Sequence, residues 1–380
     1  MREYLLVFLA AGVASYLLCV FARELAIRSG AVARVRDRDV HATPIPYFGG
    51  VAMLGGLGAG LLVARHLPFL STSQPIVFHD AGIVLVAGAM ICAVGVVDDL
   101  IELDALTKLG GQIVAAGFLV LNDVKLFSIN LPGVGQFVLD PTQGVLLTML
   151  LVVSTVNAVN FVDGLDGLAG GVVLIGAVAF FLFSYKLADA NGETLAITAA
   201  MLCAAMGGAC AGFLPHNFFP ARIFMGDSGS MLLGLVLSGS ALTLTGQFAS
   251  VSVKSGSGGD GSFVMLLPIL LPVSILVVPL SDLVLAVVRR TRRGQAFYQP
   301  DKEHLHHRLL EIGHSQRRAV LIMWLWAGLI AFGGVLVSLY SGRLTWSLLA
   351  TGTLVTVALT FILPRVQRPG ELRPEDHLVR

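Results

Sequence analysis

The sequence contains few charged residues. Asp, Glu, Lys and Arg make up only 13% of its 380 residues, about half the share of an average soluble domain, whereas 56% of the residues are hydrophobic. The 25 basic and 24 acidic residues leave a formal net charge of +1. Because no excess of positive charge would attract nucleic acid, we expect no nucleic-acid partner. The composition is instead typical of a membrane protein.

Cysteine is also scarce, and its pattern excludes two kinds of site. All of the cysteines lie in apolar runs, without a Cys-x-x-Cys pair and without companion histidines at zinc spacing. They are Cys19, Cys92, Cys203 and Cys210. We therefore expect reduced packing residues and neither a disulfide framework nor a zinc centre.

Long apolar runs dominate the rest of the chain. A hydrocarbon core of roughly 30 Å needs about 20 apolar residues per helix, and this criterion predicts about eleven spans. They lie at approximately 4–22, 48–64, 81–97, 107–121, 143–160, 168–186, 195–214, 229–247, 263–286, 319–340 and 344–363. We expect an all-α, polytopic integral membrane protein forming a single domain over 1–380, with a small hairpin within 122–142.

The basic residues are distributed unequally between the two sides of this map. Of the 25 Lys and Arg residues, 19 fall on one side, mainly in loops 23–47 and 287–318 and in the tail 365–380. Positively charged loops tend to stay in the cytoplasm. The sequence therefore predicts an N-terminus outside the cell, a cytoplasmic C-terminal tail and a multi-pass protein of the cell membrane.

Four polar clusters interrupt the apolar chain, and all four fall on the predicted cytoplasmic side. They are Asp98-Asp99, the segment from Asn157 to Gly167, the segment from Phe224 to Ser230, and the segment from His304 to Arg308. Ionisable groups near membrane helix ends are often functional. Their shared side indicates that the clusters form one site.

The first two clusters carry carboxylates and amides at helical spacing. Asp98 and Asp99 precede Lys108, and the three could hold a metal-bound diphosphate, although an acidic pair can also simply end a helix. The second cluster places Asn157, Asn160, Asp163 and Asp166 about one turn apart. Its Asp-Gly-Leu-Asp-Gly run could be only a tight turn, but a turn does not explain two preceding amides in lipid.

Asp227 lies near the start of an apolar run, where backbone N–H groups and the helix dipole favour anions. A plain N-terminal cap is the alternative interpretation. Mg²⁺ prefers one or two carboxylates together with phosphates and water. Asp227 and Asn160 could supply the protein ligands of such an ion, and Mn²⁺ could substitute for Mg²⁺.

The histidine cluster lies in the longest predicted cytoplasmic loop. Its members are His304, His306, His307 and Arg308. Zinc binding is disfavoured because no second ligand cluster lies at suitable spacing. Contact with phosphate or sugar is the preferred interpretation.

These motifs together resemble the polyprenyl-phosphate N-acetylhexosamine-1-phosphate transferase superfamily, particularly its WecA-type members of the actinobacterial kind. The similarity extends over nearly the whole chain and also includes Arg36 to Pro44, Gly212 to Asn217 and Pro300 to Leu309. It implies a homodimer with a cytoplasmic cleft that takes UDP-GlcNAc and a polyprenyl phosphate within membrane lipid.

The resemblance also implies functions for individual residues. Asp227 and Asn160 correspond to Mg²⁺ ligands, and Asp98, Asp99, Asp163 and Lys108 to catalytic groups. The implied substrate-binding residues are Asn157, Gly164, Leu165, Asp166, Asn217, Phe224, His304, His306, His307 and Arg308. Within this set, Phe224 would stack on uracil and Arg308 would recognise the sugar.

One departure bears on the sugar. Enzymes that load MurNAc-pentapeptide usually carry three adjacent histidines, whereas this chain has His304-Leu305-His306-His307-Arg308. This favours UDP-GlcNAc and leaves a MurNAc-pentapeptide or another UDP-N-acetylhexosamine as alternatives. A secondary transporter is disfavoured, because its polar groups should lie near the midplane and its halves should be related.

Overall fold

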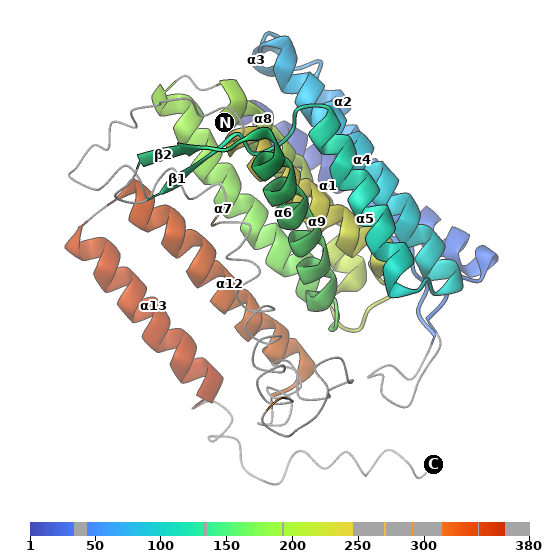
Figure 1. Cartoon of the computed structure of the whole chain (residues 1–380). Helices are drawn as coiled ribbons and strands as arrows, with labels where there is room; N and C mark the ends of the chain where they lie inside the picture. The colour runs from blue at the N-terminus through green and yellow to red at the C-terminus, as the bar shows by residue number, and fades with distance from the viewer. Residues whose placement is uncertain are drawn as a thin grey trace.

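The structure is a computed structural model that describes residues 1–33, 44–131, 135–191, 194–245, 314–340 and 342–361, with the single residues 270 and 291. The described part is almost entirely helical. Its helices are α1 (Arg2–Ser29), α2 (Gly49–Ala64), α3 (Pro68–Ser71), α4 (Pro75–Ile101), α5 (Ala105–Leu121), α6 (Pro141–Val162), α7 (Leu168–Asn191), α8 (Thr194–Asn217), α9 (Gly226–Thr245), α12 (Gln316–Leu339) and α13 (Arg343–Phe361). Figure 1 shows them as a bundle, with α12 and α13 side by side at one edge.

The helices confirm the predicted fold class. Eight are long and apolar enough to cross a membrane, and α2 and α5 are shorter apolar helices. The chain is an all-α, multi-pass membrane protein. Ten of the expected spans coincide with these helices, while the span at 263–286 and the tail 365–380 lie outside the described residues. The total of eleven spans and their orientation stay predictions.

The predicted hairpin is present between α5 and α6. Strands β1 (Ser128–Leu131) and β2 (Gly135–Val138) pair antiparallel, with Ser128 opposite Val138. A capping box at Asp140 and Gln143 then starts α6. The hairpin lies at the end of α5 opposite to Lys108, so it takes no part in the polar clusters.

Helix α9 is the centre of the bundle. It packs against α2, α4, α6 and α8, and every one of its residues except Asp227 is buried. Gly50 of α2 and Gly95 of α4 lie so close to its first turn that a Cβ on either glycine would overlap the backbone of residues 227–229. These close approaches fix the start of α9 between two neighbouring helices.

A polar cap sets the start of α5. Asp104 Oδ1 accepts hydrogen bonds from the backbone N–H groups of Leu106 at 2.9 Å and Thr107 at 3.0 Å. This satisfies two donors that the first turn would otherwise leave unpaired. Lys108 therefore lies one turn into a well-defined helix, close to the end of α4.

The packing of α9 against α4 generates a stability prediction. Gly95→Ala must displace the first turn of α9, and overpacking of this kind costs about 1–3 kcal/mol of unfolding free energy. Gly82→Ala in the same helix has open space around its new Cβ and should leave the protein equally stable or slightly more stable. Thermal unfolding in detergent compares the two; equal melting temperatures would contradict the described packing.

Candidate active site

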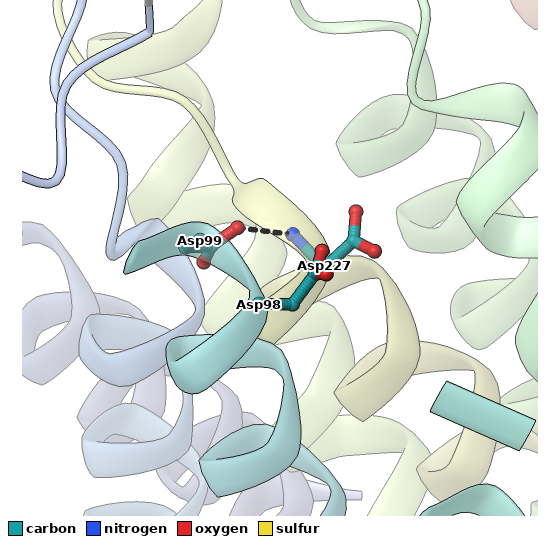
Figure 2. A group of neighbouring side chains, drawn as sticks. All are labelled: Asp98, Asp99 and Asp227. Atoms are coloured by element: carbon teal, nitrogen blue, oxygen red, sulfur yellow. Dashed lines mark hydrogen bonds between the residues drawn. The ribbon is translucent and has the colours of Figure 1, made fainter. Parts of the chain in front are cut away.

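Three helix ends meet at one end of the bundle and bring the predicted carboxylates together. Asp98 and Asp99 come from the last turn of α4, Asp227 from the first turn of α9, and Asn160 from the last turn of α6. Ligand oxygens of the three aspartates lie within 4.8 Å of one another. Figure 2 shows Asp98 and Asp99 of α4 facing the start of α9. Residues far apart in the sequence thus form one acidic cluster.

Lys108 joins two of these carboxylates. Its Nζ lies 2.7 Å from Asp98 Oδ2 and 2.8 Å from Asp227 Oδ2. The second oxygen of Asp98 accepts a hydrogen bond from the backbone N–H of Leu103 at 2.7 Å. Because carboxylates at such short range repel one another, the ammonium between them stabilises the arrangement.

The amide of Asn160 faces Asp227 from the other side. Its Nδ2 donates to Asp227 Oδ1 and to Ser230 Oγ, both at 2.9 Å. The two ends of an amide have nearly the same shape, so a half-turn about Cβ–Cγ would present Oδ1 to Asp227 instead. Asn160 can therefore offer either a donor or an oxygen ligand at the same place.

Asp99 is bound differently from Asp98. Its Oδ1 accepts a hydrogen bond from the backbone N–H of Asp227 at 2.9 Å, and its Oδ2 lies 3.4 Å from the backbone nitrogen of Ser228. The first of these bonds is drawn in Figure 2. Asp98 therefore binds Lys108 and the backbone that follows its own helix, whereas Asp99 binds the backbone at the start of α9.

Asp163 adds a further carboxyl group at the end of α6, where it is the C-cap residue. Burial, together with the nearby carboxylates of Asp227, Asp99 and Asp166, raises the pKa of Asp163 from 3.8 to about 8. Asp163 is therefore largely protonated near neutral pH, and the negative charge at the site comes mainly from the other carboxylates.

The donor set fits a divalent cation that prefers oxygen. Asp98, Asp99 and Asp227 supply carboxylate oxygens, and Asn160 can supply an amide oxygen. Mg²⁺ is usually held by one or two carboxylates, with water and phosphate completing an octahedron. Asp227 contacts both Lys108 and Asn160 and so joins the acidic cluster to the amide.

Comparison with known proteins agrees with this geometry. Residues 81–245, which contain all of these groups, match the model of the family described as glycosyl transferase family 4. The chain is 46% identical to the decaprenyl-phosphate N-acetylglucosaminephosphotransferase of Mycobacterium tuberculosis, over 99% of this chain and 92% of the relative. The chain belongs to glycosyl transferase family 4.

Further relatives carry related names. The decaprenyl-phosphate N-acetylglucosaminephosphotransferase of Mycolicibacterium smegmatis is 46% identical over 95% of this chain and 89% of the relative. The undecaprenyl-phosphate alpha-N-acetylglucosaminyl 1-phosphate transferase of Escherichia coli is 28% identical over 83% of this chain and 79% of the relative. The similarity to these transferases therefore extends well beyond the segment matched by the family model.

Two of the expected substrate-binding residues bind the backbone of neighbouring loops. Asn217 accepts a hydrogen bond from Gly167 N at 2.9 Å and donates one to Ile223 O at 3.0 Å. Asp166 Oδ2 accepts one from Ala221 N at 2.9 Å. Both side chains are only 3% exposed. They join the loop after α6 to the loop after α8. In the loop after α6, Gly164 is exposed and Leu165 is buried.

Asn157 also makes a contact that the sequence did not indicate. Its Nδ2 donates to Gln112 Oε1 at 2.6 Å and to Val153 O at 2.8 Å. Gln112 follows Lys108 by one helical turn, and a buried amide at that spacing in an apolar helix was the available signal. The pair links α5 to α6, so Asn157 supports the cluster one turn away from Asn160.

A second aromatic ring lies beside Phe224. The ring centroids of Tyr47 and Phe224 are 6.0 Å apart, and residue 46 accepts a backbone hydrogen bond from Phe224 at 2.8 Å. Both rings are partly exposed. Sequence reasoning missed Tyr47, because the two residues are far apart in the chain. The histidine loop with His304, His306, His307 and Arg308 lies outside the described residues.

The electrostatics of Asp163 generate a pH prediction. Its pKa rises on folding from 3.8 to about 8, so the carboxyl destabilises the fold progressively as pH rises between those values and fully above about 8. Asp163→Asn should therefore raise the melting temperature of the EDTA-treated protein more at pH 8 than at pH 5. Scanning fluorimetry in detergent measures both, and a variant that is less stable than the wild type at pH 8 would contradict the assigned repulsion.

Proposed function

We propose that the protein transfers GlcNAc-1-phosphate from UDP-GlcNAc to a polyprenyl phosphate, giving polyprenyl-diphosphate-GlcNAc and UMP. The observation that carries the proposal is the Asp98–Lys108–Asp227–Asn160 cluster, in a chain that is 46% identical to a decaprenyl-phosphate N-acetylglucosaminephosphotransferase over nearly its whole length. The names of the Mycolicibacterium and Escherichia relatives support the same reaction.

The chemistry joins two anions. An oxygen of the lipid phosphate forms a bond to the β-phosphorus of UDP-GlcNAc, the bond from that phosphorus to the bridging oxygen breaks, and UMP leaves with the bond's electrons. A phosphate monoester is already largely ionised near neutral pH, so the nucleophile needs little help from a base. Catalysis then rests on positioning and on offsetting negative charge.

Mg²⁺, or Mn²⁺ in its place, would be held by Asp227 and by the side-chain oxygen of Asn160. When bound, the ion supplies positive charge to the diphosphate and to the leaving phosphate. The support for this assignment is the oxygen-rich donor set around Asp227 and its surplus of negative charge. Asp163 is largely protonated near neutral pH, and a bound cation would favour its ionised form.

Lys108 is the protein's own cation at the reaction centre. Its ammonium lies between Asp98 and Asp227, where it can contact a diphosphate that approaches Asp227. We assign Asp98 to orienting Lys108 and the lipid phosphate, because one of its oxygens is bound to that ammonium and the other to the backbone of Leu103. The carboxylate is thereby held in one orientation.

The uracil base would bind beside Phe224 and Tyr47, where a flat ring can stack on an aromatic surface. Asn217, Asp166, Gly164 and Leu165 would shape this pocket by holding the two loops around it. Asn157 would act at a distance from this pocket, by linking α5 to α6 beside Asn160. The loop with His304, His306, His307 and Arg308 would recognise the N-acetylated sugar.

The lipid and the location follow from the same comparisons and from the charge map. Decaprenyl phosphate is the favoured acceptor, because the relatives named for it are 46% identical, whereas the Escherichia relative named for undecaprenyl phosphate is 28% identical. The basic loops favour a plasma-membrane protein whose active site faces the cytoplasm. We propose a homodimer on the family resemblance.

A transfer assay tests the proposal. Purified protein, decaprenyl phosphate, Mg²⁺ and UDP-GlcNAc labelled in the sugar should give lipid-soluble label and UMP in equal amounts, and EDTA should abolish both. Asp227→Asn should lower turnover by about 100-fold or more, because it replaces the charged carboxylate ligand with a neutral amide. Asp189→Asn, an exposed change in α7 at the other end of the bundle, is the matched control and should retain full activity.

One outcome would contradict the proposed reaction, and another would contradict the proposed metal site. Label that stays in the aqueous phase with folded wild-type protein would exclude the transfer reaction. Full activity of Asp227→Asn at ordinary Mg²⁺ concentration would remove Asp227 from the metal site while leaving the reaction itself in place.

A further inference from the structure

The first turn of α9 has no acceptor of its own at the position where a helix is normally capped. Backbone N–H groups of a first turn have no partner within the helix, and a Ser, Thr, Asp or Asn just before it usually accepts one of them. The residue before Gly226 is Met225, whose thioether sulfur is only a weak hydrogen-bond acceptor. Yet α9 is buried in the bundle, where an unpaired donor is costly.

Asp99 supplies the missing acceptor from another helix. Its two oxygens face the backbone nitrogens of Asp227 and Ser228, at 2.9 and 3.4 Å, across 128 residues of sequence. A carboxylate at this end of a helix also interacts favourably with the helix dipole. Figure 2 shows the side chain of Asp99 reaching from the end of α4 to the start of α9.

Gly226 makes room for this contact. Its φ is +72°, a conformation that side-chain-bearing residues rarely adopt, and a Cβ there would overlap the carboxylate of Asp99. Gly50 of α2 and Gly95 of α4 pack closely against the same turn. The backbone that carries Asp227 is thus held by a carboxylate and by close packing on two sides.

The cap leaves the side chain of Asp227 available for the site. An aspartate at a helix start often caps its own helix, but Asp227 instead directs its oxygens to Lys108 and Asn160, at 2.8 and 2.9 Å. Because Asp99 accepts the hydrogen bond from the backbone N–H of Asp227, the Asp227 side chain is not needed to cap the helix. Asp99 therefore caps α9, and Asp227 contacts Lys108 and Asn160.

We infer that Asp99 is a positioning residue that acts through Asp227: it fixes the first turn of α9 so that the Asp227 carboxylate points at the metal and the diphosphate. This inference rests on the proposed function for its catalytic consequence. It assigns Asp99 neither the removal of a proton from the lipid phosphate nor direct contact with it. Asp98, which binds Lys108, remains the member of the pair that faces the reacting groups.

Substitutions of Asp99 separate positioning from base catalysis. Asp99→Asn keeps the size and one acceptor for Asp227 N, whereas Asp99→Ala keeps neither. We expect Asp99→Asn to lose less activity than Asp99→Ala, and the alanine variant to need about 10–100-fold more Mg²⁺ for half-maximal rate, as for other residues that support a metal ligand. Gly226→Ala should reproduce the alanine phenotype, because it displaces the same turn.

The pH–rate profile is a second readout. A base whose proton transfer limits the rate shapes the acidic limb of the profile, and Asp99→Asn would remove that limb. A positioning residue leaves the limb in place at a lower rate, which is the result we expect. The inference would be overturned if both Asp99 variants lost activity to the same extent and the residual activity of Asp99→Asn no longer showed the acidic limb.

Asp140→Ala is the matched control, since it removes the carboxylate cap of helix α6 at the opposite end of the bundle. It should leave the Mg²⁺ requirement unchanged; the same increase as in Asp99→Ala would mean that loss of any helix cap suffices and would overturn the inference.

Direct Mn²⁺ binding to the purified full chain separates this inference from the proposed function. Asp99→Ala should bind Mn²⁺ more weakly than wild type, and Asp99→Asn should fall between them. Unaltered Mn²⁺ affinity in Asp99→Ala would overturn the inference even if the wild type is an active transferase. If the wild type binds Mn²⁺ but transfers no sugar phosphate, the proposed function fails, and the order of Mn²⁺ affinities still decides what Asp99 does.

Discussion

The site depends on a balance of charge at the ends of apolar helices. Four aspartates, Asp98, Asp99, Asp163 and Asp227, gather where membrane helices end, and their mutual repulsion must be offset. Lys108 bridges two of them, and the N–H groups at the start of α9 hold a third. Negative charge beyond what these donors neutralise attracts a cation, and a cation in turn would attract a diphosphate. The same imbalance that lowers the stability of the fold makes the site suitable for binding.

The bundle maintains this balance by fixing α9 at its centre. Close packing of Gly50 and Gly95 against the first turn leaves the backbone of Asp227 little freedom. The Asp104 cap orders the first turn of α5, which carries Lys108 to Asp227. Hydrogen bonds from Asn217 and Asp166 hold the two adjoining loops together. Site geometry is thus a consequence of helix packing at one end of the bundle.

The sequence predicted the helices and the members of the acidic cluster well. Apolar runs mark most helices because lipid requires them, and the carboxylates and amides stand out against that background. The sequence could not predict from which donor each oxygen accepts its hydrogen bond. Asp99 caps a helix that begins 127 residues later, Gln112 pairs with Asn157 on the next helix, and Tyr47 lies beside Phe224. Such contacts depend on how the helices pack, which neither periodicity nor local spacing reveals. Asp99 illustrates this most clearly, because its position beside Asp98 suggested a shared task.

Mn²⁺ binding with and without UDP tests most directly whether this charge imbalance forms a metal–diphosphate site. Electron paramagnetic resonance can follow Mn²⁺ bound to the full-length protein, and phosphorus couplings report whether the bound ion contacts the nucleotide. The account predicts that UDP strengthens Mn²⁺ binding to the wild type and that phosphorus coupling appears in this complex and is lost in Asp227→Asn. A protein-bound Mn²⁺–UDP complex with the same affinity and coupling in Asp227→Asn would contradict it.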